Sequence, residues 1–228
     1  MVAIPITTSM LNLAGNSTPV REKAVKEQPK ESLYNFILKW EGKGKADEPG
    51  RAYLEGPNNI LTIGVGHKVL SYEKDENLKK VIGNKKEDYD KYVKGEVPLT
   101  DKQAEQLFDL DSVDKINIAK NLFQKYEHFP TYLQHALFNM VYRGEIKAKH
   151  ETAKAIERGD FRTAADEYLD RDDYRKAKSH GINRGIIARM DSNAKALKRY
   201  ATEIEDIDRT DPLGLSLLSP KQRRDIKI

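Results

Sequence analysis

One short turn sequence constrains the fold more than any other feature of this chain. The residues GPNN at 56–59 separate two short strand candidates, Arg51–Glu55 and Ile60–Val65. Gly, Pro and Asn are the residues that tight turns select, so the pattern predicts an antiparallel β-hairpin. From Leu99 onward the apolar residues follow helical periodicity instead. We therefore expect an α+β fold, with a small hairpin lobe, a larger all-helical lobe and a ligand-binding cleft between them.

The helices can be placed by their apolar faces and caps. Leu33, Phe36, Ile37 and Trp40 share one face of a helix that ends near Glu41. Thr100 and Gln103 form a capping box at the start of another helix. Further helices are expected at 112–124, after Pro130, and at 151–158, 161–169 and 184–202.

The 228 residues divide into three predicted parts. Residues 1–29 lack steady periodicity and are interpreted as an extension or linker. Residues 30–204 are the predicted folded domain, and 205–228 are a predicted tail that runs from an acidic stretch to a basic end.

Composition excludes several kinds of protein. There is no cysteine, which rules out a disulfide scaffold, a zinc ribbon and a thiol nucleophile. A net charge of +4 is too small to indicate nucleic-acid binding. The sequence contains no run of 18 apolar residues, so we expect no membrane-spanning helix. The N-terminal residues also lack the basic start of a secretory signal. The histidines show no metal-ligand spacing, so we expect neither a metal nor a cofactor.

Glu41, Glu55 and Thr62 are the candidate catalytic residues. Glu41 ends an apolar helix, Glu55 ends the first predicted strand, and Thr62 lies in the second. Cleavage of a glycosidic bond uses two carboxyl groups across a cleft, one protonated and one ionised. A threonine hydroxyl can help to hold the attacking water. By spacing alone, two solvated surface glutamates remain the alternative.

Several motifs resemble those of the T-even phage lysozyme family, which comprises phage endolysins and tail-associated muramidases. LKWEG at 38–42, AYLEG at 52–56 and TIGVGH at 62–67 are similar to the family's signature. LTDKQAEQLFDLD at 99–111, LQHALFNMVYRG at 133–144, IERGDFRTAADEYL at 156–169 and NRGIIAR at 183–189 follow in the family's order. The similarity covers residues 31–202.

The resemblance implies a lysozyme-like fold and a role for each matching residue. Glu41 matches the family's general acid, Thr62 its catalytic threonine, and Glu55 stands where the family has an aspartate. Arg184 matches an arginine that pairs with the catalytic glutamate, and Asn139 matches an asparagine on a helix that lines the cleft. His67, which closes TIGVGH, is expected to be structural.

This chain departs from the family in its spacing. Thirteen residues separate Glu41 from Glu55, and six separate Glu55 from Thr62, and both gaps are longer than is usual in the family. Asp47 and Glu48, within the first gap, are therefore rival candidates for the second carboxylate.

The function implied by the resemblance is hydrolysis of the β-1,4 bond between N-acetylmuramic acid and N-acetylglucosamine in peptidoglycan, with inversion. The alternatives are a lytic transglycosylase and an inactive lysozyme-fold module that binds the wall or serves in a virion. Implied partners are peptidoglycan strands and phage tail or capsid proteins, but no nucleic acid. The protein is expected in the virion, or in the host cytoplasm before a holin releases it to the periplasmic wall.

Overall fold

The computed structural model describes residues 31–41, 50–55, 58–180 and 184–211. The predicted extension at 1–29 lies outside these residues, and so do Asp47, Glu48 and most of the predicted tail. In chain order the described elements are α1 (Leu33–Glu41), β1 (Tyr53–Glu55), β2 (Ile60–Ile63), β3 (His67–Lys68), α2 (Glu76–Ile82), α3 (Lys86–Val93), α4 (Asp101–Leu122), a 3₁₀ turn (Tyr126–His128), α5 (Thr131–Tyr142), α6 (Glu151–Glu157), α7 (Phe161–Leu169), α8 (Asp172–His180) and α9 (Arg184–Thr210).

The predicted hairpin is confirmed, and a short third strand extends it. β1 pairs antiparallel with β2, and β2 pairs antiparallel with β3. The second strand ends at Ile63 rather than at residue 65, because Gly64 (φ 61°) and Gly66 (φ 79°) turn the chain back. At Gly66 a Cβ atom would lie 2.7 Å from Tyr142 Oη, so this close approach requires glycine.

Two helices that the sequence analysis does not predict, α2 and α3, complete the small lobe with β1–β3. Both helices are rich in lysine and short, so their apolar pattern is sparse. They are held by a few buried side chains, including Leu78 and Tyr89, that pack with Ile63 and Leu107. Tertiary packing therefore stabilises these helices more than their intrinsic propensity does.

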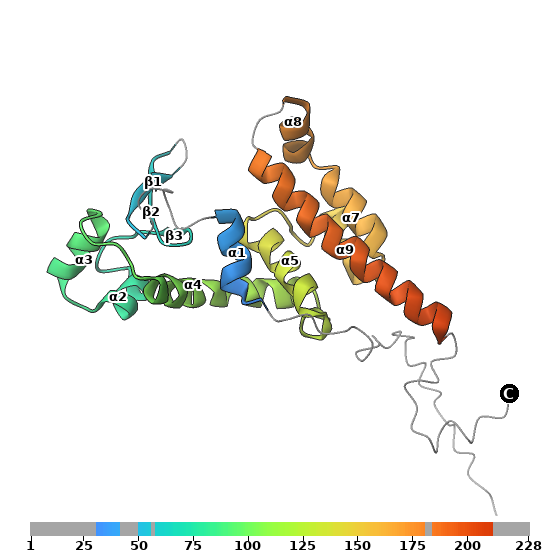
Figure 1. The fold of residues 1–228 in the computed structure, drawn as a ribbon, viewed down its shortest axis with the longest axis horizontal. Coiled ribbons are helices and arrows are strands. Elements are labelled where there is room, and N and C mark those ends of the chain that lie inside the picture. The colour runs from blue at the N-terminus through green and yellow to red at the C-terminus, as the bar shows by residue number, and fades with distance from the viewer. Residues whose placement is uncertain (1–30, 42–49, 56–57, 181–183, 212–228) are drawn as a thin grey trace, which may run out of the picture.

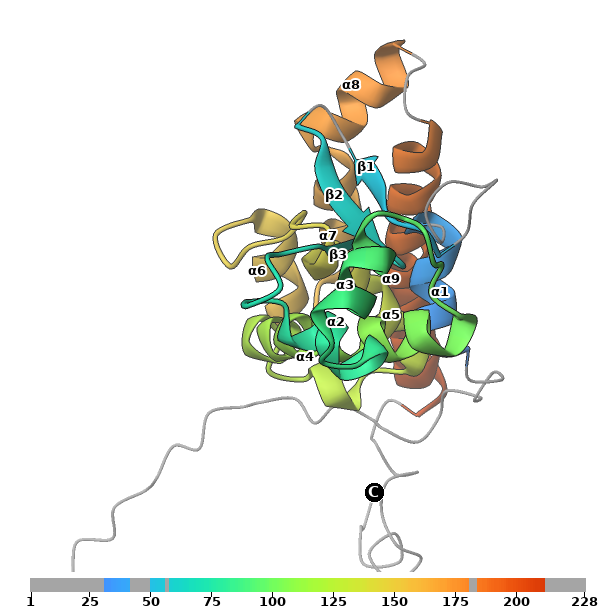
Figure 2. The same cartoon turned by 90° about the vertical axis from the view of Figure 1, so that its left-hand side faces the viewer.

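One long helix, α4, joins the two lobes, with its predicted capping box of Thr100 and Gln103 at its N-terminus. The prediction of a separate helix at 112–124 is wrong, because α4 continues unbroken to Leu122. Figure 1 shows α4 running from α2 to α5, and Figure 2 views the molecule from the α2–α3 end.

The helical lobe is formed by α5, α6, α7, α8 and α9, and its core includes Leu137, Phe161, Tyr168 and Leu197. The predicted break between α6 and α7 is confirmed, with Gly159 at φ 81° and Asp160 capping α7. The predicted end of the last helix near residue 202 is wrong, since α9 runs to Thr210.

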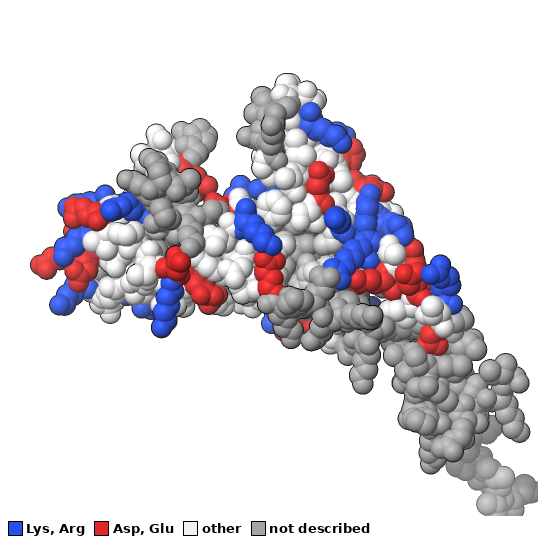
Figure 3. All heavy atoms as spheres, in the orientation of Figure 1, with Lys and Arg blue, Asp and Glu red and all other residues white. Residues whose placement is uncertain are grey.

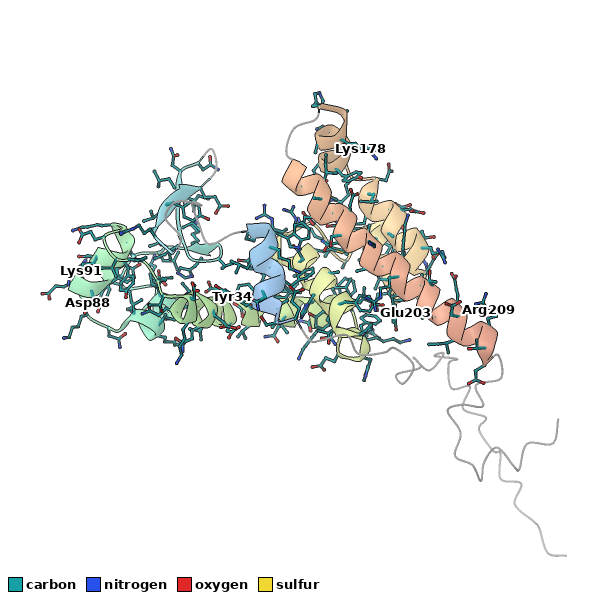
Figure 4. The ribbon with its side chains drawn as sticks, viewed as in Figure 1. Tyr34, Asp88, Lys91, Lys178, Glu203 and Arg209 are labelled. Atoms are coloured by element: carbon teal, nitrogen blue, oxygen red, sulfur yellow. The ribbon has the colours of Figure 1, made fainter. Side chains whose placement is uncertain are left out.

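Ion pairs explain why the acidic part of α9 is helical. Arg199 pairs with Glu203 one turn later at 2.8 Å, and Arg162 of α7 pairs with Glu205 at 2.6 Å. Figure 4 shows Glu203 and Arg209 on this last stretch of the helix. Because α9 passes through residue 204, the predicted domain boundary there falls inside a helix.

The lobes meet at a third apolar cluster, in which α1 is central. Tyr34 of α1, labelled in Figure 4, packs edge-on against Phe108 of α4 with the ring centroids 5.7 Å apart. Ile37, Val65 and Phe138 complete the buried contact. This cluster fixes the end of α1, and with it Glu41, beside the sheet. None of the described helices is long and apolar enough to cross a membrane.

Candidate active site

A cleft of about 550 Å³ lies between the small lobe and the helical lobe. Residues of α1, β1, β3, α4 and α5 line it, and the surface in Figure 3 is hollowed between the sheet and the α8–α9 region. Glu41 and Glu55 both line this one cleft, although thirteen residues separate them in the sequence.

Glu41 is the last residue of α1, and its side chain is only 10% exposed. Its Oε2 accepts a hydrogen bond from Arg143 Nη1 at 2.8 Å, while its Oε1 is buried with no hydrogen-bond partner among the described residues. Burial raises the pKa of Glu41 above its ordinary value, although Arg143 and Arg189 oppose that shift. The nearby Glu55 carboxylate raises the pKa further. This environment favours the protonated form that a general acid needs.

Glu55 and Thr62 come together through the register of the hairpin. Tyr53 stands opposite Thr62 and Glu55 opposite Ile60, so Glu55 and Thr62 are diagonal neighbours on one face of the sheet. Thr62 Oγ1 lies 3.2 Å from Glu55 Oε2 and 3.2 Å from the carbonyl oxygen of Ile60, so its one proton can be donated to either. The hydroxyl is 1% exposed, whereas Glu55 is open to solvent.

Glu41 and Glu55 also act electrostatically on Tyr53. Burial raises the pKa of Tyr53 to about 12, and Glu55 and Glu41 both add to that shift. The phenol therefore stays protonated at neutral pH and can donate a hydrogen bond on the face that carries Thr62.

The arginine that contacts Glu41 is Arg143, which follows the last residue of α5. Arg184 begins α9, but its side chain is outside the described residues, so its predicted pairing stays a prediction. Sequence reasoning missed Arg143, although it lies inside the VYRG motif and directly precedes Gly144 (φ 66°), where α5 ends.

A buried polar network that includes Arg189 and Glu145 lies near Glu41. Arg189 of α9 donates to Glu145 at 2.5 Å, and both side chains are less than a tenth exposed. Tyr168 also donates to Glu145, and Asn193 donates to Tyr168 at 3.1 Å. This network fixes Arg189, whose charge acts on Glu41, and no motif in the sequence indicates it.

The predicted substrate contact Asn139 lies inside α5 and is 0% exposed. Both polar atoms of its amide lack a partner among the described residues, and Asn139 is not one of the residues that line the cleft. Direct contact with a ligand would therefore require movement of the residues that cover it.

His67 links three elements at the other end of the cleft. Its Nδ1 lies 2.7 Å from Asp111 of α4, and its Nε2 lies 3.1 Å from Asp75, the N-cap residue of α2. Burial lowers the pKa of His67, but the hydrogen bonds with Asp111 and Asp75 outweigh it and raise the pKa to about 9. Both ring nitrogens are thus hydrogen-bonded to carboxylates. Among the described residues, no group of three or more His, Asp or Glu side chains is arranged to hold a metal ion.

Neither a protein-family model nor a curated protein matches this chain.

Proposed function

We propose that this protein is a muramidase that hydrolyses the β-1,4 bond between N-acetylmuramic acid and N-acetylglucosamine of peptidoglycan. The observation that carries the proposal is the arrangement of two unlike glutamates along one cleft. Glu41 is nearly buried and has a raised pKa, while Glu55 is exposed and bonded to the Thr62 hydroxyl. Two carboxyl groups in different environments are what acid-assisted glycoside hydrolysis requires.

Each residue has a distinct role in this proposal. Glu41 donates its proton to the leaving glycosidic oxygen, and Arg143 stabilises the carboxylate that remains. Glu55 accepts a proton from a water, and Thr62 helps to orient that water, since its hydroxyl keeps lone pairs for one of the water's hydrogens. Attack from the opposite face of the sugar would invert the anomeric configuration.

The proposed fold class is that of the T-even phage lysozymes. Support comes from the order of the elements: a helix that ends in Glu41, a hairpin that carries Glu55 and Thr62, and a longer helical part. A role in phage lysis or cell entry, with location in the virion or in the host cytoplasm, belongs to the same proposal.

The hydrogen bond between Thr62 and Glu55 favours hydrolysis over the lytic transglycosylase alternative. A transglycosylase uses the substrate's own C6 hydroxyl as nucleophile, so it has no need of a group that positions water. An inactive wall-binding module would not need the raised pKa of Glu41.

Mass spectrometry of digested peptidoglycan tests the proposal. Wild type should release fragments with hydrated, reducing muramic ends, and Glu41→Gln should lose at least ~10²-fold in rate, the lower end of what general acid catalysis contributes. Glu76→Gln is the matched control, since Glu76 lines the same cleft but is exposed and paired with Lys79 at 2.7 Å.

Three outcomes would contradict the muramidase proposal. Anhydro-muramic ends would assign a transglycosylase, and an absence of fragments from folded wild type would assign a binding module. Full activity in Glu41→Gln would remove Glu41 from the mechanism.

A further inference from the structure

The cleft contains more positive charge than its catalytic chemistry uses. Lys68, Lys74 and Lys115 all line it, and none has an ion pair with any residue that the structure describes. A lone surface lysine is ordinary, but three of them face one concave surface from β3, from the loop before α2 and from α4.

Four of the five acidic residues that line the cleft are paired with basic or amide side chains, and the fifth, Glu55, accepts a hydrogen bond from Thr62. Asp75 and Asp111 bind His67, and Asn77 donates to the second oxygen of Asp111 at 2.9 Å. Glu76 pairs with Lys79 at 2.7 Å, and Glu41 pairs with Arg143. Lys115 follows Asp111 by one helical turn, yet Asp111 is held by His67 and Asn77, so the Lys115 ammonium stays available.

Lys68 is the lysine that the sheet register places beside the proposed reaction centre. β3 places it directly opposite Thr62, and β1 places Tyr53 opposite Thr62 on the other side. Side chains of directly opposed residues lie on the same face of a sheet, about 4.5–5.5 Å apart at Cβ. Tyr53, Thr62 and Lys68 thus form one row, and Lys68 flanks the hydroxyl on the side away from β1.

We propose that Lys68, Lys74 and Lys115 form a cationic subsite that binds the carboxylates of the peptide stem of peptidoglycan. The inference rests on the proposed muramidase function and names the part of the substrate that this chain selects. In an intact strand the lactyl carboxyl of muramic acid is bonded to the stem as an amide. The free carboxylates near the scissile bond are therefore those of the stem. A stem that leaves the sugar next to Thr62 starts on the sheet face that carries Lys68, and Lys74 and Lys115 line the same cleft.

Peptidoglycan with charged stems and peptidoglycan with neutral stems together distinguish this subsite from general electrostatic attraction to the cell wall. Amino groups of purified peptidoglycan are acetylated, and the free carboxyl groups of one half are then converted to carboxamides, which keep the stem's shape but remove its charge. Rates of fragment release and cosedimentation of the protein are measured on both halves. The proteins are wild type, the triple variant Lys68→Gln/Lys74→Gln/Lys115→Gln, and a control with Lys102→Gln/Lys149→Gln/Lys195→Gln, whose lysines are exposed and away from the cleft.

Wild type and the control should lose roughly tenfold in kcat/KM on the carboxamide form, since each accessible ion pair contributes little by itself. The triple variant should bind and cleave both forms equally, at about the rate of wild type on the carboxamide form, with kcat at saturation kept. If kcat/KM fell by the same factor in wild type and in the triple variant when the charged stems are replaced by carboxamides, the subsite would be overturned. If the triple variant and the control both lost the same factor in kcat/KM relative to wild type on charged peptidoglycan, the lysines would act by general charge attraction. That result would also overturn the subsite.

If the protein is not a muramidase, the same experiment gives a different result. Wild type would then release no fragments from either form, while cosedimentation would still report whether the three lysines distinguish charged from neutral stems.

Discussion

At the scale of a single residue, Thr62 supports the proposed water-activating step, because its hydroxyl contacts Glu55 from a buried position. Thr62→Val keeps the shape of the side chain and removes this hydrogen bond. A hydrogen bond to a charged group contributes ~1.5–3 kcal/mol, so kcat should fall about ten- to hundredfold. Steady-state kinetics on soluble glycan fragments measure the loss. Thr62→Ser, which keeps a hydroxyl, should retain most of the activity, and an equally inactive Ser variant would contradict the role.

Arg143 acts on the chemistry through the charge that it places beside Glu41. Burial raises the pKa of Glu41, and Arg143 opposes that rise. Arg143→Met should therefore raise the pKa further. A general acid loses activity as pH rises through its pKa, so the alkaline limb of the kcat/KM profile should move to higher pH. Arg143→Lys keeps the charge and should leave the limb near its wild-type position. A shift to lower pH in Arg143→Met would show that Glu41 is not the group that titrates.

At the scale of elements, His67 connects β3 to α2 and α4 through Asp75 and Asp111. The pKa of His67 is raised from 6.5 to about 9, so its charge stabilises the fold fully below pH 6.5 and loses this effect as pH rises through 9. His67→Asn should thus cost roughly 3 kcal/mol of unfolding free energy near pH 6 and much less near pH 10. Urea unfolding at several pH values measures the difference.

The pKa of Asp75, which binds His67, shifts in the opposite direction. Burial alone would raise the pKa of Asp75, but the hydrogen bond and charge of His67, together with the backbone N–H groups of Leu70 and Leu78, lower it from 3.8. The stability that it contributes is present above pH 3.8 and is lost as the pH falls below that value. A cost of His67→Asn that did not change with pH would show that His67 contributes by packing alone.

At the scale of the whole molecule, the two lobes have cores of unequal size. The helical lobe packs its apolar side chains from α5, α6, α7 and α9 into one large cluster, whereas the small lobe relies on a handful around Leu78 and Ile63. Native-state hydrogen exchange should therefore find the slowest amides in α5, α7 and α9, with α2, α3 and β1–β3 opening at lower free energy.

A pair of core substitutions tests this difference. Leu78→Ala, at a site 0% exposed, should destabilise by about 2–5 kcal/mol and speed exchange in the small lobe, while leaving the helical lobe protected. Leu197→Ala, equally buried in α9, should speed exchange in both lobes. Equal effects of the two variants on all helices would show one cooperative unit instead.

The sequence by itself determined the local elements whose signals are short-range. Turn residues at 56–59 between two short strand candidates predicted the hairpin, the capping box placed the start of α4, and Gly159 and Asp160 placed the break between α6 and α7. Such signals depend on backbone geometry and hydrogen bonds within a few residues, so they can be predicted without knowledge of the fold.

Tertiary structure decided the rest, because it depends on contacts between distant residues. The lysine-rich helices α2 and α3 are stabilised by packing on the small-lobe core, and α9 extends through its acidic end because Arg162 and Arg199 pair with it. Arg143 contacts Glu41, since the end of α5 lies beside the end of α1. The unlike environments of Glu41 and Glu55 arise where two lobes meet, and no local pattern in the chain encodes how deeply each carboxyl group is buried.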